Sequence, residues 1–242
     1  MREFILERLS RLQNGYTVCG LVDRIGRIYP IGSDTKVISA IFEIITRPVV
    51  AAYADEVGLE LEEPSKQNHY PDFTLMRDDR DKSKIAIDVK TTYRNANHAK
   101  FAYTLGSYTS YINPETESKN IVYPYSDYKE HWVIGFVYKR MTEKRTIDPK
   151  IYSFDELENI QLPFDDVRVF VQEKWRIASD KAGSGNTTNI GSIRGDLDDF
   201  IAGNGVFVSE REFLKYWRGY KRTKRERIDS YSNVEEFRMR GM

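Results

Sequence analysis

The sequence contains very few of the residues that build disulfides and zinc sites. Cys19 is the only cysteine among 242 residues, so no disulfide can form within the chain. The three histidines, His69, His98 and His131, are too widely spaced for a Cys/His zinc motif. These absences exclude a disulfide scaffold and a zinc finger, and they are typical of a protein in the reducing cytoplasm.

The sequence also lacks an excess of charge and a long apolar segment. Lys and Arg total 37, as do Asp and Glu, so the bulk charge neither favours nor excludes a polyanionic partner. Glu3 and Glu7 lie where a signal peptide needs an apolar core, and no long uncharged apolar run follows. We therefore expect a soluble protein that is not exported and has no membrane partner.

The composition that remains is that of an ordinary globular protein. Hydrophobic residues make up 40%, aromatic residues 13% and charged residues 31% of the chain, which excludes a disordered or fibrous protein. The chain has no internal repeat, no low-complexity tract and no obvious linker. We expect a single domain over residues 1–242.

A helix and a hairpin are predicted at the start of the chain. Apolar residues at helical spacing predict a short helix over Phe4–Leu12. The β-forming segments Tyr16–Val22 and Ile28–Ile31 flank a turn and predict a hairpin over about residues 16–31. An exposed hairpin of this kind could serve a subunit interface.

A longer helix follows the hairpin. Ser33 or Asp34 caps an apolar-periodic stretch that reaches about Val57, and Pro48 is expected to kink or divide it. The polar segment from Gly58 to Asn68 is predicted to be a loop.

Segments rich in β-branched and aromatic residues predict a sheet in the rest of the chain. They are Phe73–Met76, Ile85–Val89, Asn120–Tyr123, Trp132–Tyr138 and Val167–Val171. The first two flank a charged turn and are expected to pair as antiparallel strands. With a helix near Glu210–Tyr220, this pattern indicates the α/β class.

The two strands around the charged turn carry the residues with the clearest chemistry. Because side chains alternate along a strand, Asp88 and Lys90 share a face, and Asp72 opens the neighbouring strand. Two carboxylates held close together repel unless a divalent cation lies between them, and oxygen ligands suit Mg²⁺. With Lys90 beside the reacting phosphate, this set predicts hydrolysis of a phosphodiester.

Simpler explanations exist for each acidic residue. An Asp-x-Lys pair at a strand end can be a solvated face or a surface ion pair. The position of Asp72 at the start of the preceding strand favours the catalytic interpretation. Glu43, within the amphipathic helix, is either a third carboxylate of the metal site or an exposed helical glutamate.

The glycine-rich loop at residues 183–189 is a second candidate site. Gly183 and Gly185 allow the backbone to approach a ligand closely, Asn186 can bond adenine in the major groove, and Thr187 offers a methyl group to thymine. The alternative is a plain exposed hairpin loop. A Walker phosphate loop is excluded because no Lys-Ser or Lys-Thr closes the motif.

Two further segments could contact nucleic acid. Gln67 and Asn68, just before the catalytic strand, either enter a groove or simply finish a loop. A basic run near the C-terminus could follow a phosphate backbone or form a solvated helix end. Its members are Lys215, Arg218, Lys221, Arg222, Lys224, Arg225 and Arg227.

Several segments together resemble the EcoRV-like type II restriction endonucleases of the PD-(D/E)XK nuclease superfamily, over nearly the whole chain. These segments are Ile31–Val37, Glu62–Pro64, Gln67–Leu75, Lys84–Tyr93 and Ala182–Ile193. The resemblance is most specific in the Pro-Asp…Asp-x-Lys motif and in the glycine-rich loop. It implies a restriction-endonuclease-like mixed β-sheet core flanked by helices.

The resemblance also implies roles for particular residues. Asp72, Asp88 and Lys90 match the catalytic residues, Glu43 matches the accessory carboxylate, and the hairpin near Cys19 matches a dimerisation element. The residues that match the major-groove recognition loop are Gly183, Ser184, Gly185, Asn186, Thr187, Thr188 and Asn189; Gln67 and Asn68 match a shorter minor-groove loop. Positions that approach the DNA backbone are Thr35, Thr92, Tyr93, Ser110 and Lys119.

The activity implied is Mg²⁺-dependent cleavage of double-stranded DNA by a homodimer at a short palindrome. The unaltered loop implies the sequence GATATC, cut bluntly at its centre, with a cognate adenine methyltransferase as a functional partner that makes no direct contact. The alternatives are a structure-specific repair or junction nuclease and a catalytically inactive DNA-binding module on the same fold.

Overall fold

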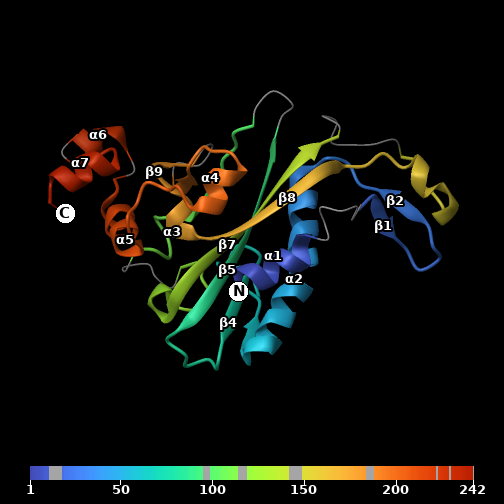
Figure 1. The fold of residues 1–242 in the computed structure, drawn as a ribbon, viewed down its shortest axis with the longest axis horizontal. Helices are drawn as coiled ribbons and strands as arrows, with labels where there is room; N and C mark the ends of the chain where they lie inside the picture. Colours follow the sequence, from blue (N-terminus) through green and yellow to red (C-terminus); the bar gives the residue numbers. More distant parts are fainter. Residues whose placement is uncertain are drawn as a thin grey trace.

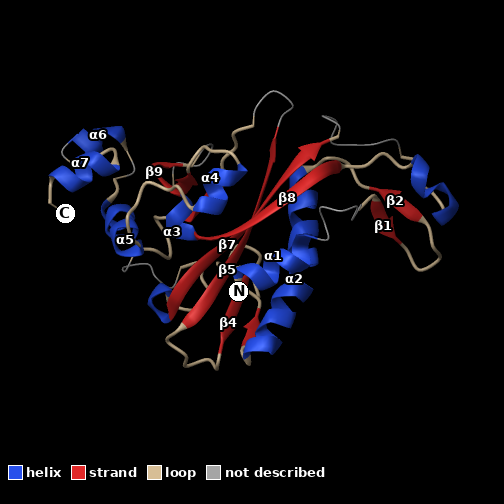
Figure 2. Ribbon diagram, in the orientation of Figure 1, coloured by secondary structure: helices blue, strands red, loops and turns tan. Residues whose placement is uncertain are grey.

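A five-stranded mixed sheet forms the centre of the molecule (Figure 1). The computed structural model describes residues 1–10, 18–94, 99–113, 119–141, 149–183, 188–221, 223–228 and 230–241. In sheet order the strands are β3 (Glu60–Glu62), β4 (Phe73–Met76), β5 (Lys84–Arg94), β7 (Tyr128–Arg140) and β8 (Phe164–Glu173). Only the pair β5–β7 is parallel. Helices flank this mixed sheet, which confirms the predicted α/β class (Figure 2).

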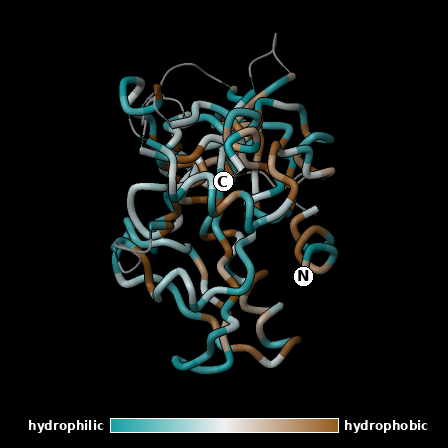
Figure 3. The backbone as a smooth tube through the Cα atoms, turned by 90° about the vertical axis from the view of Figure 1, so that its left-hand side faces the viewer, coloured by the Kyte–Doolittle hydropathy of each residue, from teal (hydrophilic) through white to brown (hydrophobic). Residues whose placement is uncertain are grey.

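Side chains that alternate along β5 belong to apolar clusters on both faces of the sheet. Ile87 and Val89 belong to one apolar cluster, beneath α1 (Arg2–Leu9) and α2 (Thr35–Val57). Ala86 belongs to the cluster on the opposite face. Asp88 and Lys90 share the face of Ala86, as the strand period predicts. In Figure 3 the hydrophobic stretches lie mainly inside the body, and the outer turns are mostly hydrophilic.

The opposite face of the sheet is covered by a second, smaller sheet and by short helices. The second sheet has the order β6 (Thr104–Ser107), β10 (Asn189–Ser192), β9 (Ala178–Ala182). The helices are α3 (Lys174–Ile177), α4 (Leu197–Ala202), α5 (Glu210–Gly219), α6 (Lys224–Ile228) and α7 (Val234–Met239), with the 3₁₀ turn η3 at Tyr125–Asp127. The sequence predicted the helix α5 but none of the three strands.

The predicted hairpin is present as a separate two-stranded unit. β1 (Gly20–Val22) pairs antiparallel with β2 (Ile28–Pro30). It projects at one end of the molecule, away from the C-terminal helices, beside the 3₁₀ helix η4 (Phe154–Asn159) (Figure 1). An isolated bridge between Ile28 and Tyr152 joins the two segments.

Helix α2 packs onto the sheet through one stripe of its surface. Asp34 caps its start by accepting hydrogen bonds from the backbone of Lys36 (2.9 Å) and Val37 (3.4 Å). Buried residues recur every four positions, at Ile38, Phe42, Thr46, Val50 and Ala54. Pro48 does not divide the helix, contrary to the prediction, because it lies on the exposed face, where water can bond the carbonyl it leaves free.

By length and composition, α2 is also a helix that could cross a membrane. Its middle carries Glu43 and Arg47, and its buried stripe belongs to the apolar cluster that covers the sheet. One such helix is weak evidence of a membrane span, because the core helix of a globular protein passes the same test.

Three other local predictions are wrong or incomplete. The segment after Gly58 was predicted to be a loop, but Glu60–Glu62 forms the edge strand β3, because its backbone pairs with β4 despite its polar side chains. Residues 120–123 form no strand, and Ile121 makes only an isolated bridge with Tyr70. Of the first helix, predicted over Phe4–Leu12, the structure describes Arg2–Leu9 with Ser10 as its C-cap, and Leu12 lies outside the described residues.

The packing of α2 predicts a large loss of stability for Phe42→Ala. The Phe42 ring is 1% exposed and stacks on Phe136 with a centroid distance of 4.5 Å. We expect the free energy of unfolding, measured by urea denaturation, to fall by about 3–5 kcal/mol. Ile44→Ala, on the exposed face of the same helix (69% exposed), is the control and should change it by less than about 0.5 kcal/mol. Equal losses in both variants would contradict this orientation of α2.

Candidate active site

Asp72 and Asp88 meet beside the start of β4, where this strand pairs with β5. The antiparallel register pairs Phe73 with Ile87, so one further step places Asp72 opposite Asp88. Asp72 lies just outside β4, and its Oδ2 accepts a hydrogen bond of 2.6 Å from the backbone N–H of Val89. Just before β4 begins, the Asp72 side chain thus replaces a backbone group as the hydrogen-bond partner of β5.

Lys90 completes the face that carries Asp88. Its Nζ lies 2.7 Å from Oδ2 of Asp88 as an ion pair and donates to the carbonyl of Val89 at 3.2 Å. Asp88 is 3% exposed, and its Oδ2 has no hydrogen bond of regular geometry with the described residues. This oxygen therefore retains capacity to bind a cation.

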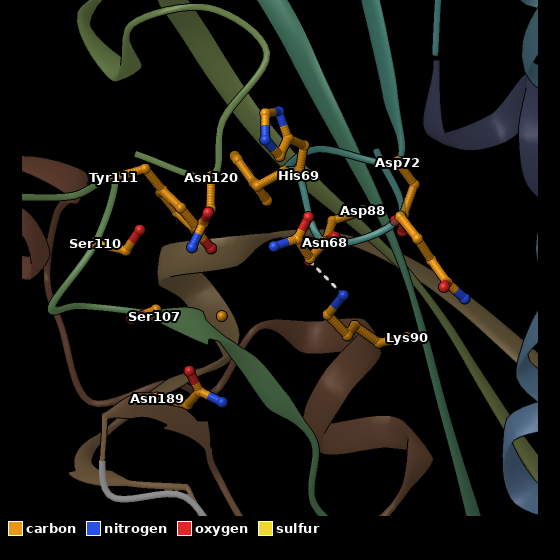
Figure 4. Close-up of a pocket in the computed structure, with 13 residues that line it drawn as sticks. Asn68, His69, Asp72, Asp88, Lys90, Ser107, Ser110, Tyr111, Asn120 and Asn189 are labelled. Atoms are coloured by element: carbon orange, nitrogen blue, oxygen red, sulfur yellow. Dashed lines mark ion pairs between the residues drawn. The ribbon is translucent and has the colours of Figure 1, made fainter. Parts of the chain in front are cut away.

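These three side chains line a cavity of about 260 Å³ (Figure 4). Asp88 and Lys90 come from β5 and Asp72 directly precedes β4, while Asn68 and His69 lie beside them in the close-up. The remaining wall comes from the β6 and β10 side. The residues lining the cavity are Gln67, Asn68, His69, Tyr70, Asp72, Asp88, Lys90, Gly106, Ser107, Ser110, Tyr111, Asn120 and Asn189.

Burial and mutual repulsion set the charge of this cavity. Burial, followed by the adjacent Asp88 carboxylate, raises the pKa of Asp72 to about 7, although Lys90 and the Val89 N–H act in the opposite direction. Burial would lower the pKa of Lys90, but Asp88 and Asp72 outweigh burial and hold it above its ordinary value. Lys90 therefore stays protonated, and its positive charge attracts the carboxylates of both Asp72 and Asp88.

Glu43 approaches the same pair from α2. It is half-buried, and burial raises its pKa, with Lys90 opposing and Asp88 adding to that shift. It lines an adjoining cavity of about 280 Å³, and Asp72 and Gln67 line both cavities. Glu43 therefore lies on the α2 side of Asp72 rather than in the cavity that holds Asp88.

The donor set fits a hard divalent cation that keeps much of its water. Within the described ranges, no three His, Cys, Asp or Glu side chains form a ready cluster around one point. The cavity supplies two carboxylates, one with a buried oxygen that lacks a regular hydrogen bond. Mg²⁺ binds proteins through one or two carboxylates and several waters, so these residues suit it.

The structure brings some of the predicted DNA-contacting residues to this cavity and leaves others outside it. Gln67, Asn68, Ser110 and Asn189 line it. Thr35 lies at the start of α2, Thr92 and Tyr93 lie further along β5, Lys119 is exposed, and Gly183 and Thr188 lie at the base of the β9–β10 loop. Ser184, Gly185, Asn186 and Thr187 lie outside the described residues.

Sequence reasoning predicted Ser110 but missed its neighbours Gly106, Ser107 and Tyr111 in the cavity wall. Ser107 and Tyr111 line the cavity, and Ser107 Oγ donates to the Thr188 carbonyl at 3.2 Å. A run of serine, threonine and tyrosine from Ser107 to Tyr111 is the only signal in the sequence, and no motif connects it with Asp72.

Three comparisons relate this chain to known proteins. The type II restriction enzyme EcoRV of Escherichia coli is 50% identical over 238 residues, which cover 98% of this chain and 96% of that protein. Among solved structures, the NlaIV restriction endonuclease is 11% identical with a TM-score of 0.43, covering 100% of this chain and 90% of that chain. The sequence matches the family described as restriction endonuclease EcoRV over residues 12–240. The chain therefore belongs to the EcoRV family of type II restriction endonucleases.

Proposed function

We propose that this type II restriction endonuclease uses Mg²⁺ to hydrolyse both strands of DNA at a short palindrome. The observation that carries the proposal is the meeting of Asp72 and Asp88 at the start of β4, with Lys90 paired to Asp88 in the same cavity. Pairs of acidic residues with an adjacent lysine suit phosphodiester hydrolysis, because they hold a cation and stabilise a reacting phosphate.

Each residue has a distinct role in this proposal. Asp72 and Asp88 hold the cation, and Glu43 on the α2 side of Asp72 is the accessory carboxylate. Lys90 keeps its proton and holds a positive charge beside the scissile phosphate. Magnesium, when bound, polarises a phosphoryl oxygen and lowers the pKa of a water molecule.

The β9–β10 hairpin is the proposed base-reading element. Gly183 donates to the carbonyl of Asn189 at 2.7 Å and closes the hairpin that carries residues 184–187. In the proposal these residues, with Gly183, Thr188 and Asn189, read the major groove, and Gln67 and Asn68 read the minor groove. The proposed target is GATATC, cut bluntly at its centre, where the flexible TA step is easily deformed. Backbone contacts are assigned to Thr35, Thr92, Tyr93, Ser110 and Lys119.

The proposed active form is a homodimer that forms through the β1–β2 hairpin and η4. Leu21 is 63% exposed, Val22 56%, Ile25 75% and Phe154 55%. The two segments adjoin, because a side chain added at Gly26 would lie 3.4 Å from the Phe154 ring. Exposed apolar groups gathered in this way are typical of a protein interface, and a palindromic target needs two copies of the site.

In the cell, a nuclease of this specificity requires protection of the host's own sites. We propose a cognate adenine methyltransferase as its functional partner, without direct contact, and action in the cytoplasm, where the host DNA lies.

The proposal predicts that purified protein with Mg²⁺ cuts long double-stranded DNA at one sequence only. Sequencing every cut end of a digested DNA of known sequence is the measurement, and blunt ends confined to GATATC are expected. Ends confined to another sequence would contradict the role given to the 183–189 loop. Cleavage at branched structures, or binding without any cleavage, would instead support the repair-nuclease or inactive-module alternatives.

Asp88→Asn is predicted to abolish most cleavage. The substitution keeps the shape of the side chain but removes the charge that holds the cation, and losing several kcal/mol of such stabilisation lowers the rate roughly a thousandfold. Single-turnover cleavage of the cognate site measures the effect. Asp127→Asn is the matched control, because Asp127 is also buried and paired with a lysine, Lys82, at 2.7 Å. Equal losses in the two variants would show a general effect of removing a buried charge.

Ile25→Asp is predicted to convert the dimer to a monomer, because it places a charge in the centre of the apolar hairpin surface. The mass in solution, measured by light scattering during size-exclusion chromatography, should fall by half. Val208→Asp is the control at equal exposure (74% against 75%) and should leave the mass unchanged. A monomeric wild-type protein would contradict the proposed interface.

A further inference from the structure

Lys174 is a buried lysine that the proposed mechanism does not use. It is the first residue of α3, directly after β8, and it is 1% exposed. Its Nζ has no hydrogen-bond partner within the described ranges and lies 3.8 Å from the centre of the Tyr70 ring. A buried polar group without a partner destabilises a protein, so an apolar side chain would serve the fold better here.

Tyr70 connects this lysine to the active site. It lies two residues before Asp72, and its backbone N–H donates to the carbonyl of Asn120 at 2.9 Å. Its ring stacks on Tyr111 with a centroid distance of 4.4 Å, and its hydroxyl hydrogen-bonds Nδ1 of His131 at 2.8 Å. The ammonium group of Lys174 lies 3.8 Å from the centre of the same ring and 5.5 Å from the centre of the Tyr111 ring. The ring is thus held on its edge, its face and its backbone.

We propose that Lys174 is a positioning residue for Asp72, which it holds in place through a cation–π contact with the Tyr70 ring. The inference rests on the proposed function, because it assigns Asp72 to the metal site. An ammonium over an aromatic face is attracted strongly where water is excluded. The contact fixes the segment that enters β4, and therefore the direction in which the Asp72 carboxylate faces Asp88.

The electrostatic surroundings keep Lys174 charged. Burial lowers the pKa of Lys174 to about 8, while Asp88, Asp72 and Glu210 favour its protonated form and Lys90 opposes it. His131, on the other side of Tyr70, remains neutral, because burial and the charge of Lys174 lower its pKa. At neutral pH most molecules therefore keep the charge that the contact with Tyr70 requires.

A second buried lysine provides a matched comparison. Lys84 is 0% exposed and its Nζ lies 4.0 Å from the centre of the Tyr123 ring. Unlike Lys174, it donates to two backbone carbonyls, those of Asp79 (2.8 Å) and Asp81 (2.6 Å), in the turn between β4 and β5. Lys84 therefore has a sufficient structural role in the turn, and its ammonium does not face the cavity that contains Asp72.

The test compares Lys174→Met with Lys84→Met in the full-length protein. The readout is single-turnover cleavage of the cognate DNA as a function of Mg²⁺ concentration, with urea unfolding measured in parallel. In Lys174→Met the Mg²⁺ concentration for half-maximal rate should rise roughly tenfold or more, as it does when groups that orient metal ligands are removed. Lys84→Met should lose stability and keep the wild-type Mg²⁺ dependence.

The two possible roles of Lys174 predict opposite changes in the Mg²⁺ concentration that gives half-maximal rate. If Lys174 acted only as a nearby positive charge, its removal would strengthen Mg²⁺ binding, and the half-maximal concentration would fall. A fall, or no change, would overturn the positioning role. Tyr70→Leu should raise the concentration as Lys174→Met does, and the double variant should show no further rise; additive effects would also overturn it.

Folding and the proposed function are controlled separately. Should Lys174→Met fail to fold, Lys174→Gln gives the same test with a polar neutral side chain. Wild-type protein that does not cut DNA would refute the proposed function, whereas active wild type with unchanged Lys174 variants would refute only the inference about Lys174.

Discussion

The confinement of two carboxylates at the end of one strand is the constraint on which the rest of the structure depends. Asp72 can stand opposite Asp88 because β4 begins only at Phe73 and the Asp72 side chain accepts a hydrogen bond from the Val89 N–H. Burial there is unfavourable for two like charges, and for this reason the pKa of Asp72 is raised. Much of the surrounding structure keeps this pair in place until a cation can lie between its members.

A neutral chain can act on a polyanion because the sign of its charge varies from place to place. The carboxylates of Asp72 and Asp88 would repel a phosphate, so the cavity needs positive charge to admit one. Lys90 supplies it at the surface of the site, at 24% side-chain exposure, and a bound cation would supply more. The balance of 37 basic and 37 acidic residues thus does not identify the partner, whereas the arrangement of charged side chains within one cavity is informative about it.

That Asp72, Asp88 and Lys90 come together could be predicted from the sequence because their arrangement is local. The strand period puts Asp88 and Lys90 on one face, and a short charged turn brings Asp72 to them. The strands β6, β9 and β10 could not be predicted, because they are short and contain glycine or serine, and because β6 pairs with β10 from a distant part of the chain, although β9 and β10 form a local hairpin. The strand predicted at residues 120–123 is absent for the converse reason. Their side chains favour a strand, but only Ile121 forms a bridge with another segment. Lys174 gave no signal in the sequence, since its significance depends on a ring that is distant in the chain.

The second sheet explains how recognition and cleavage can be coupled within one molecule. The carbonyl of Thr188, at the base of the proposed base-reading loop, accepts hydrogen bonds from the backbone of Tyr108 at 3.1 Å and from Ser107 Oγ at 3.2 Å. Ser107 and Asn189 also line the cavity that contains Asp88. A movement of the loop on DNA would therefore be transmitted to the wall of the active site through two hydrogen bonds rather than through the whole fold. A restriction endonuclease must remain inactive on every sequence but its own, and if the loop reads bases as proposed, this short connection would let the correct bases alter the catalytic cavity directly.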